Sequence, residues 1–523
     1  MPRLSTFAFC VLFTLNAVAG ESISRPGVLH LTLDQAIQMA LAKNFSIEVS
    51  RFEPRIARER VTSALGRFDP EFTLRRTFSE NTQRDFFLDE RHVSGTSILQ
   101  GESLSTALGG LTPWGLTYDL SLATRLRSGT SNDFDEDFTS EATIALRQPL
   151  LRDAGPNANL AQVRIARNNL LVSEWQLRQQ VINVITETVF TFNELHLAHE
   201  NLALALRSRA LAEQTQKDNI RRFEIGTMSP LNITTAKAEV AAREEAVIVA
   251  QRLIKDNENF LKQLVTDDLE PMLDVKVEIE PPPSPAFRAD VPAGLVEAMR
   301  WRPDYRQAVL DLERRNINLL FSRNQALPRL DLTGSLSLLG FDNDAGTSLD
   351  RTFRRDQTVW TAGAIFSVPI PNREGRGAEN AARLSAGQGL VNLQRLEQQI
   401  VVDVDNTSGS IVSARERIAS TAEASKLAAE SLDAGEQRLQ VGTGTTFEVL
   451  ELQRRLVEAE FTRLRARADY NKAVNEYYRQ TGVTLRVYRI EIGLNSDERD
   501  ATGGLAKTLR FRNSDLPKPS SPK

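Results

Sequence analysis

Two groups of side chains in this sequence have residue types and spacing that could bind a metal ion. His196 and His199 stand three residues apart in a helical stretch, a spacing at which two imidazoles can share one ion. Asp133-Phe-Asp-Glu-Asp137 imitates the start of a calcium-binding loop. Phe138 stands where that loop needs glycine and Ile144 where it needs glutamate, and no carboxylate pattern or thiol accompanies the histidines. We therefore favour a solvated helix face and a solvated loop over metal sites.

Glu448 and Glu451 form a third candidate pair. They lie three residues apart in a predicted helix that follows Gly442, so both carboxylates share one helix face. A favourable interaction with the helix dipole would explain acidic residues in a first helical turn without any binding role. The sequence has no phosphate-binding loop ending in Gly-Lys-Ser/Thr and no G-x-S-x-G nucleophile elbow. We predict no catalytic activity, no metal site and no cofactor.

Composition restricts the class of protein. The 523 residues include 64 basic and 68 acidic side chains, for a net charge of −4, and 41% are hydrophobic. This charge content excludes a polytopic helical membrane protein, and the near balance gives no indication of nucleic-acid binding. No run of 18 apolar residues follows residue 20, so a chain of this kind could cross a bilayer only as a β-barrel.

The N-terminal stretch predicts export. The only cysteine, Cys10, lies in an apolar segment that ends in Ala17-Val-Ala19, the pattern of a cleaved secretory signal. We predict a signal peptide over residues 1–19 and an N-terminal segment over 20–30. The exported chain would then contain no thiol, and therefore no disulfide and no thiolate metal site.

The elements that position the candidate residues occur twice. Arg222-Phe-Glu-Ile-Gly-Thr227 returns as Arg438-Leu-Gln-Val-Gly-Thr443, and Phe68-Asp-Pro70 returns as Ala326-Leu-Pro328. Each copy reads as helix, strand region, very long helix, glycine turn and returning helix. The predicted units are a first repeat over 31–269 with strands within 71–148 and a helical hairpin over 155–265, a proline-rich linker over 270–292, a second repeat over 293–482 with strands within 329–368 and a hairpin over 375–481, and a disordered tail over 483–523.

The long helices and the strands together favour an unusual architecture. Helices as long as those between Gly155 and Gly226, or between Gly375 and Gly442, reach roughly 100 Å, which no compact core accommodates. A seven-residue repeat from Val404 to Leu439 predicts a coiled-coil seam. The strand regions alternate apolar and polar residues, which suits a wall between lipid and water. From the alternation alone an ordinary half-buried sheet is the commoner explanation, and the long helices favour the wall.

In this order, the landmarks resemble the TolC family of outer-membrane efflux and secretion channels. The features that carry the resemblance are the turns Ile225-Gly226-Thr227 and Val441-Gly442-Thr443, the entry Leu31 to Asn44 and the corner Leu146 to Leu151. The resemblance covers about residues 30 to 482. It implies a mainly α fold with a transmembrane β-barrel: a homotrimer in which two strand hairpins per chain close a twelve-strand barrel and two helical hairpins per chain form a periplasmic α-helical barrel. The segment from Ser105 to Arg127 departs from this pattern and predicts either an extracellular hairpin or two further strands.

The resemblance also implies a function. It predicts a passive exit duct in the outer membrane of a Gram-negative bacterium, serving a tripartite efflux pump or a type I secretion system. An inner-membrane pump and a periplasmic adaptor, or membrane fusion protein, would be its partners. The alternative class is an exported coiled-coil scaffold without a pore. The sequence leaves open which of the two transport systems the duct serves, and which substrate it carries.

The resemblance implies that the helical-hairpin tips are both gate and adaptor-docking site. The tips correspond to residues 223–231 and 439–447, with Ile225, Gly226 and Thr227 in the first and Val441, Gly442 and Thr443 in the second. Glu448 and Glu451 correspond to the acidic constriction, whereas the first repeat has Asn232 and Thr235 there. A trimer would place six such carboxylates at its narrowest point, which would favour cations and bind divalent ions.

Overall fold

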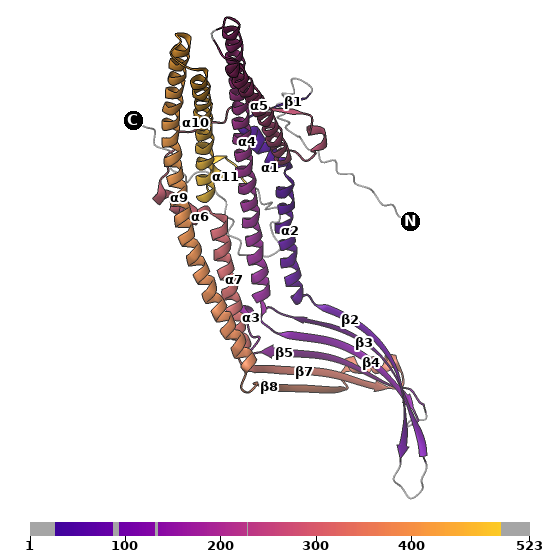
Figure 1. Cartoon of the computed structure of the whole chain (residues 1–523). Helices are drawn as coiled ribbons and strands as arrows, with labels where there is room; N and C mark the ends of the chain where they lie inside the picture. Colours follow the sequence, from indigo (N-terminus) through magenta and orange to yellow (C-terminus); the bar gives the residue numbers. More distant parts are fainter. Residues whose placement is uncertain (1–26, 87–93, 131–133, 227, 493–523) are drawn as a thin grey trace, which may run out of the picture.

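Two long helical hairpins stand side by side, and one sheet lies at the end opposite their tips (Figure 1). The computed structural model describes residues 27–86, 94–130, 134–226 and 228–492. The predicted signal peptide over 1–19 lies outside these residues, as do most of the predicted segment over 20–30 and most of the predicted tail.

The two repeats share a pair of opening helices and a long helical hairpin, and they differ in their short helices and in the number of strands. The first repeat consists of α1 (Leu33–Lys43), α2 (Phe45–Leu65), β2 (Glu71–Phe86), β3 (Ser94–Leu111), β4 (Thr117–Gly129), β5 (Asp137–Pro149), α3 (Pro156–Asn159), α4 (Ala161–Glu224) and α5 (Pro230–Val265). The second consists of α6 (Val291–Trp301), α7 (Pro303–Gln325), β7 (Arg329–Asp342), α8 (Ala345–Arg354), β8 (Gln357–Ser367), α9 (Arg373–Gln440) and α10 (Thr446–Gln480).

Each repeat opens with two helices that meet at one extended residue. Asn44 separates α1 from α2 with φ −70° and ψ 120°, and Arg302 separates α6 from α7 with φ −67° and ψ 120°. The Asn44 side chain accepts a hydrogen bond from the backbone N–H of Ser46 at 2.9 Å and so caps α2. In the second repeat Pro303 starts α7, where its fixed φ suits the first helical position.

The long helices set the dimensions of the molecule. α4 has 64 residues and α9 has 68, so each is roughly 100 Å long. Val404, Ile411 and Leu432, which lie on the predicted seven-residue seam of α9, are buried. Among the described residues, none of the helices is long and apolar enough to span a membrane.

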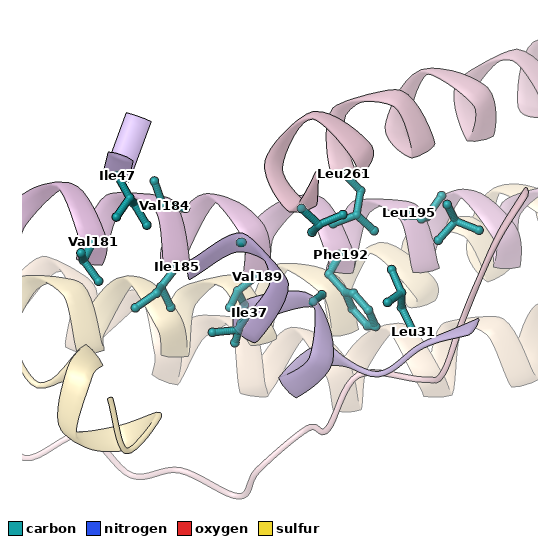
Figure 2. Close-up of a cluster of buried hydrophobic side chains, with 14 of the residues drawn as sticks. Leu31, Ile37, Ile47, Val181, Val184, Ile185, Val189, Phe192, Leu195 and Leu261 are labelled. Carbon is teal, nitrogen blue, oxygen red and sulfur yellow. The ribbon is translucent and has the colours of Figure 1, made fainter. Parts of the chain in front are cut away.

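Two hydrophobic cores, one in each repeat, hold the helices together. In the first core, Phe192 and Leu195 of α4 pack with Leu261 of α5 and with Leu31, and all four side chains are at most 3% exposed (Figure 2). The second core joins α6, α9 and α10 and includes the aromatic ring of Phe287, 5.4 Å from that of Tyr477. Because Phe287 comes from the linker, the connection between the repeats is itself packed.

The linker and the start of the tail are more ordered than the sequence suggests. Within the predicted linker, β6 (Lys276–Ile279) pairs in parallel with β1 (Val28–Leu31), and a 3₁₀ turn spans Glu270–Met272. The predicted disorder of the tail does not hold for residues 483–492. That stretch forms α11 (Thr484–Val487) and then packs apolar side chains against the first core, because Tyr488, Ile490 and Ile492 can bury there.

All six long strands form one antiparallel sheet in the order β2-β3-β4-β5-β7-β8. The resemblance implied four strands per chain, and the two additional ones are β3 and β4. The short helix α8, which the sequence analysis did not predict, lies between β7 and β8. Its Ser348 hydroxyl donates to the carbonyl of Gly340 at 2.8 Å and accepts from the backbone N–H of Ser140 at 3.0 Å.

The register assigns every strand residue to a face. In each strand pair, residues directly opposite one another are both even-numbered or both odd-numbered. Opposite residues point to the same side of a sheet, and successive residues alternate. Even-numbered side chains of all six strands therefore share one face, and odd-numbered side chains share the other.

Candidate functional site

On the even-numbered face, the rows nearest the long helices are mainly apolar and exposed, whereas further along the strands Arg76 pairs with Glu102 and the short α8 packs over Gly340. One row across it has a large apolar side chain from every strand: Phe72, Leu108, Leu120, Ile144, Leu336 and Trp360. Phe72 is 68% exposed and Trp360 is 73% exposed. An exposed apolar surface of this extent is typical of contact with lipid or with another protein.

The odd-numbered face is polar. The neighbouring row consists of Thr73, Ala107, Ser121, Thr143, Ser337 and Val359. Hydroxyl groups on this face bond across the strands: those of Thr143 and Ser337 are 2.7 Å apart, as are those of Ser335 and Thr361. Small hydroxylated side chains suit a surface that faces water.

The two faces help to distinguish the two explanations of the alternating sequence, a wall between lipid and water and an ordinary half-buried sheet. An ordinary half-buried sheet would cover its apolar face with helices of the same chain. Here Leu120, Ile144 and Leu336 in the middle of the face are 42–47% exposed among the described residues. The structure therefore favours a wall with one apolar and one polar side over an ordinary half-buried sheet.

Both helical hairpins reverse at a glycine with positive φ. Gly226 has φ 78° and Gly442 has φ 82°, values that only glycine adopts readily. The N–H of Gly226 donates to the carbonyl of Phe223 at 2.8 Å. In the second tip the N–H of Thr443 donates to the carbonyl of Arg438 at 2.9 Å. The structure thus places these predicted tip residues at the turns, whereas Thr227 lies outside the described residues.

The tips end in exposed apolar side chains. Ile225 is 73% exposed and Leu231 71% in the first tip, while Val441 is 75% and Phe447 67% exposed in the second. The hairpin ends of α4, α5, α9 and α10, where these residues lie, are at the end of the molecule opposite the six-stranded sheet (Figure 1). They provide an apolar surface at the end of each hairpin.

Glu448 is part of the second turn. The Thr445 side chain caps α10 by accepting a hydrogen bond from the N–H of Glu448 at 3.2 Å. The Glu448 carboxylate accepts from Nη1 of Arg438 at 2.7 Å, and Nη2 of Arg438 donates to the Thr443 carbonyl at 3.5 Å. One arginine therefore joins the end of α9, the turn and the start of α10.

Glu451 is paired with two arginines on its own helix. Its Oε2 lies 2.7 Å from Nη2 of Arg454, and its Oε1 lies 3.2 Å from Nε of Arg455. Within this chain neither carboxylate stands alone at the tip, and the six-carboxylate constriction of a trimer stays a prediction. Both glutamates lie at the tip as predicted, but each carboxylate is already compensated by a guanidinium group.

Polar contacts join the two hairpins near their tips. The Arg222 guanidinium of α4 donates to the Leu439 carbonyl of α9 at 3.1 Å. The Gln453 side chain donates to the Thr215 hydroxyl at 3.1 Å. Next to this contact, burial raises the pKa of the Glu436 carboxyl above its ordinary value, although a hydrogen bond with Gln453 opposes the rise.

The remaining metal candidates do not gather ligands. Burial lowers the pKa of His196 below its ordinary value, with Arg467 and His199 adding to the shift and Glu200 opposing it. Within the described residues, no group of three or more His, Cys, Asp or Glu side chains could hold a metal ion. The first residue of the Asp133–Asp137 segment lies outside that description.

Sequence reasoning missed the cations at the tip. Arg454 and Arg455 follow Glu451 by three and four residues, so their spacing on a helix was a readable signal. Arg438 precedes Glu448 by ten residues and reaches it only because the turn brings α9 and α10 together. No local pattern predicts that pair.

Comparisons with known proteins agree with this geometry. Residues 295–483 match the family model described as outer membrane efflux protein. Nodulation protein T of Rhizobium leguminosarum bv. trifolii is 26% identical over 193 residues, which cover 36% of this chain and 39% of that protein. Outer membrane efflux protein BepC of Brucella suis is 21% identical over 340 residues, which cover 63% of this chain and 70% of that protein.

The fold extends the similarity beyond the matched segments. The Campylobacter jejuni CmeC outer membrane channel has a TM-score of 0.63 to this chain at 15% identity, covering 92% of this chain and 94% of that one. At this identity the likeness concerns the fold, and it includes both repeats. The resemblance predicted from the sequence is therefore confirmed: the chain is similar to the TolC-like outer membrane efflux proteins, by family model over residues 295–483 and by fold over most of its length.

Proposed function

We propose that this chain is a passive channel-tunnel of the outer membrane, the exit duct of a tripartite efflux pump or a type I secretion system. The observation that supports it most is the division of the sheet into an exposed apolar face and a hydroxylated polar face. Lipid would contact the first and water would fill the space behind the second. The duct itself would catalyse nothing, and the pump would supply the energy.

The proposed assembly is a trimer. The strand order leaves β2 and β8 at the edges of the sheet, and their backbones are unpaired on one side within the described chain. Open strand edges are not tolerated in lipid, so each edge must pair with another copy. Because β2 and β8 run in opposite directions, copies can join in antiparallel fashion around a closed ring. The helical hairpins of the three copies would then form the periplasmic α-helical barrel.

The proposed gate is at the hairpin tips. Contacts such as Arg222 to Leu439 hold the two hairpins of a chain together, and opening would have to break or rearrange them. The exposed Ile225, Val441 and Phe447 would dock a periplasmic adaptor through apolar contact. Glu448 and Glu451, with their arginine partners, would form the constriction.

Membrane extraction and conductance test this function. The chain expressed in a Gram-negative host should stay with the outer membrane after a carbonate wash and be released only by detergent. Purified protein in a planar bilayer should then give small single-channel steps that divalent cations reduce. Release by carbonate without detergent would instead support the scaffold alternative, and folded trimers that never conduct would mean that the tips are sealed until an adaptor binds.

A further inference from the structure

The first repeat has a pair of strands that the second repeat lacks. Between α2 and α3 the chain forms four strands, whereas only β7 and β8 lie between α7 and α9. The additional pair, β3 and β4, could fold over the outer mouth of a pore or could be part of its wall. Three observations separate these arrangements.

The first observation is the location of the β3–β4 turn. The N–H of Gly155 donates to the carbonyl of Trp114 at 3.1 Å, which ties the turn to the corner where β5 leads into α3. Gly115 at the tip of the turn has φ 95°, and a Cβ there would lie 2.6 Å from the Asp153 carbonyl oxygen. The turn is therefore packed at the helical end of the sheet, and it cannot belong to an extracellular flap.

The second observation is that the inserted strands are fully integrated into the sheet. β3 pairs with β2 from Glu71 to Phe86, and β4 pairs with β5 from Thr117 to Arg127. Across the second junction the guanidinium of Arg125 lies 3.9 Å from the Glu141 carboxylate. β2 and β5 are thus separated by two complete strands.

The third observation is the division of side chains between faces. On the even-numbered face, Leu108 of β3 and Leu120 of β4 continue the apolar row between Phe72 and Ile144. On the odd-numbered face, the small residues Ala107 and Ser121 continue the polar row. A flap in water would need no apolar side matched in register to the rest of the sheet.

We propose that the β3–β4 hairpin is part of the membrane-spanning wall, so that three chains close a wall of eighteen strands rather than twelve. This inference rests on the proposed function. Because barrel diameter grows roughly linearly with strand number, the wall would be about 1.5 times as wide as a twelve-strand one. Barrels of this strand number enclose an aqueous channel, and the hydroxylated lining would pass bulky hydrated cargo. The tips, rather than the outer membrane, would then limit the width of the substrate.

Cysteine labelling tests the placement directly. The only cysteine of the chain, Cys10, lies in the predicted signal peptide, so single cysteines can be introduced without a background. Leu120→Cys and Ser121→Cys sample the two faces of β4, and Leu336→Cys and Ser337→Cys are matched controls on β7. In proteoliposomes, a charged maleimide should label the serine-derived positions, while a lipophilic maleimide should be needed for the leucine-derived ones.

The control strand separates two kinds of failure. If both β4 positions react equally with the charged reagent while β7 keeps its contrast, the hairpin lies outside the membrane and the inference is wrong, but the proposed function stands. If β7 also loses its contrast, the sheet is not a membrane wall and the proposed function fails.

Disulfide trapping and mass test the strand count. Ser121→Cys with Thr143→Cys joins directly opposite residues of β4 and β5, so a mild oxidant should link them. Thr73→Cys with Thr143→Cys spans two intervening strands, about 14 Å at the usual strand spacing, and should not link. The reverse result would mean that β2 pairs with β5 in a twelve-strand wall. Native mass spectrometry in detergent should give three chains, and two chains would overturn the count of eighteen.

Discussion

At the tip of the second hairpin, two carboxylates face three guanidinium groups. Glu448 pairs with Arg438, and Glu451 pairs with Arg454 and Arg455. Exposed ion pairs of this kind contribute little to stability because water screens them. If the tips form the proposed constriction, their effect on permeating ions is larger, since removal of one partner leaves the other charge at a narrow point.

Neutralising the two glutamates should change ion selectivity. In the double variant Glu448→Gln/Glu451→Gln, the three arginines lose their counter-charges, so we expect the selectivity to move toward anions and the block by divalent cations to weaken. The measurement is the reversal potential in a salt gradient across a planar bilayer.

Glu458→Gln is the matched control for that variant. It removes one carboxylate from the same helix, seven residues beyond Glu451 and therefore on the same face about 10 Å away. Its selectivity should stay close to that of the parent. If the double variant also keeps the parent selectivity, Glu448 and Glu451 do not line the constriction.

The partly buried His196 should make the folded chain less stable in acid. Burial lowers the pKa of His196, with His199 and Arg467 adding to the shift. A depressed pKa means that the fold favours neutral His196. Its contribution is therefore present above the ordinary pKa of about 6.5 and is lost as the pH falls through the folded value. His196→Gln should consequently lose less melting temperature between neutral pH and about pH 5.

The half-exposed His30 provides the comparison for that measurement. Its imidazole lies 3.1 Å from the Glu278 carboxylate. Because this imidazole is half-exposed rather than buried, His30→Gln should not reduce the acid-induced loss. Equal melting curves for His196→Gln and the parent at every pH would show that His196 does not cause the loss of stability in acid.

At the scale of elements, the sequence predicts the parts of the fold that local rules determine. Gly226 and Gly442 were identifiable because a tight turn needs positive φ, and the repeat placed them at corresponding positions. The strand β6 was missed because it pairs with β1, almost 250 residues earlier in the chain, and four residues give no periodicity. α8 was missed for a similar reason, since Ser348 and Thr352 are buried only against strand backbones. The ion pair of Arg438 and Glu448 likewise depends on the finished turn.

The hairpin turn and the helix interior should respond oppositely to the same substitution. Gly442→Ala forces an alanine into positive φ and should destabilise the turn by about 1 kcal/mol. Gly409 lies inside α9 with open space around it, so Gly409→Ala should stabilise the chain by about 0.5–1 kcal/mol. Thermal unfolding in detergent measures both changes.

Export assays can distinguish a turn that takes part in gating from a turn that only connects two helices. A β-branched residue at Gly226 or Gly442 should impair export more than trimer assembly, because the strain acts at the proposed gate. Loss of the trimer itself would show instead that these glycines serve folding. Gly409→Ala should leave both export and assembly intact.

At the scale of the whole molecule, the two sheet faces should tolerate charge very differently. Leu336→Arg places a cation on the apolar face and should cost about 2–4 kcal/mol if that face contacts the middle of a bilayer. Ser337→Arg, one residue further along β7, should cost much less because it faces the polar side. Urea unfolding in lipid vesicles gives both values. Similar costs at the two positions would contradict a wall between lipid and water.

The register of the sheet limits how such a wall can change over evolution. A single added strand would reverse the direction of the chain and deliver the following helix to the wrong side of the membrane. A complete hairpin restores the direction, and if opposite residues keep the same parity, every apolar side chain remains on its own side. Pore width in this architecture can therefore increase in steps of two strands per subunit. The long helices need not change when the pore widens. α4 and α9 have similar lengths, 64 and 68 residues, although β2 to β5 precede α4 and only β7 and β8 precede α9 within the second repeat.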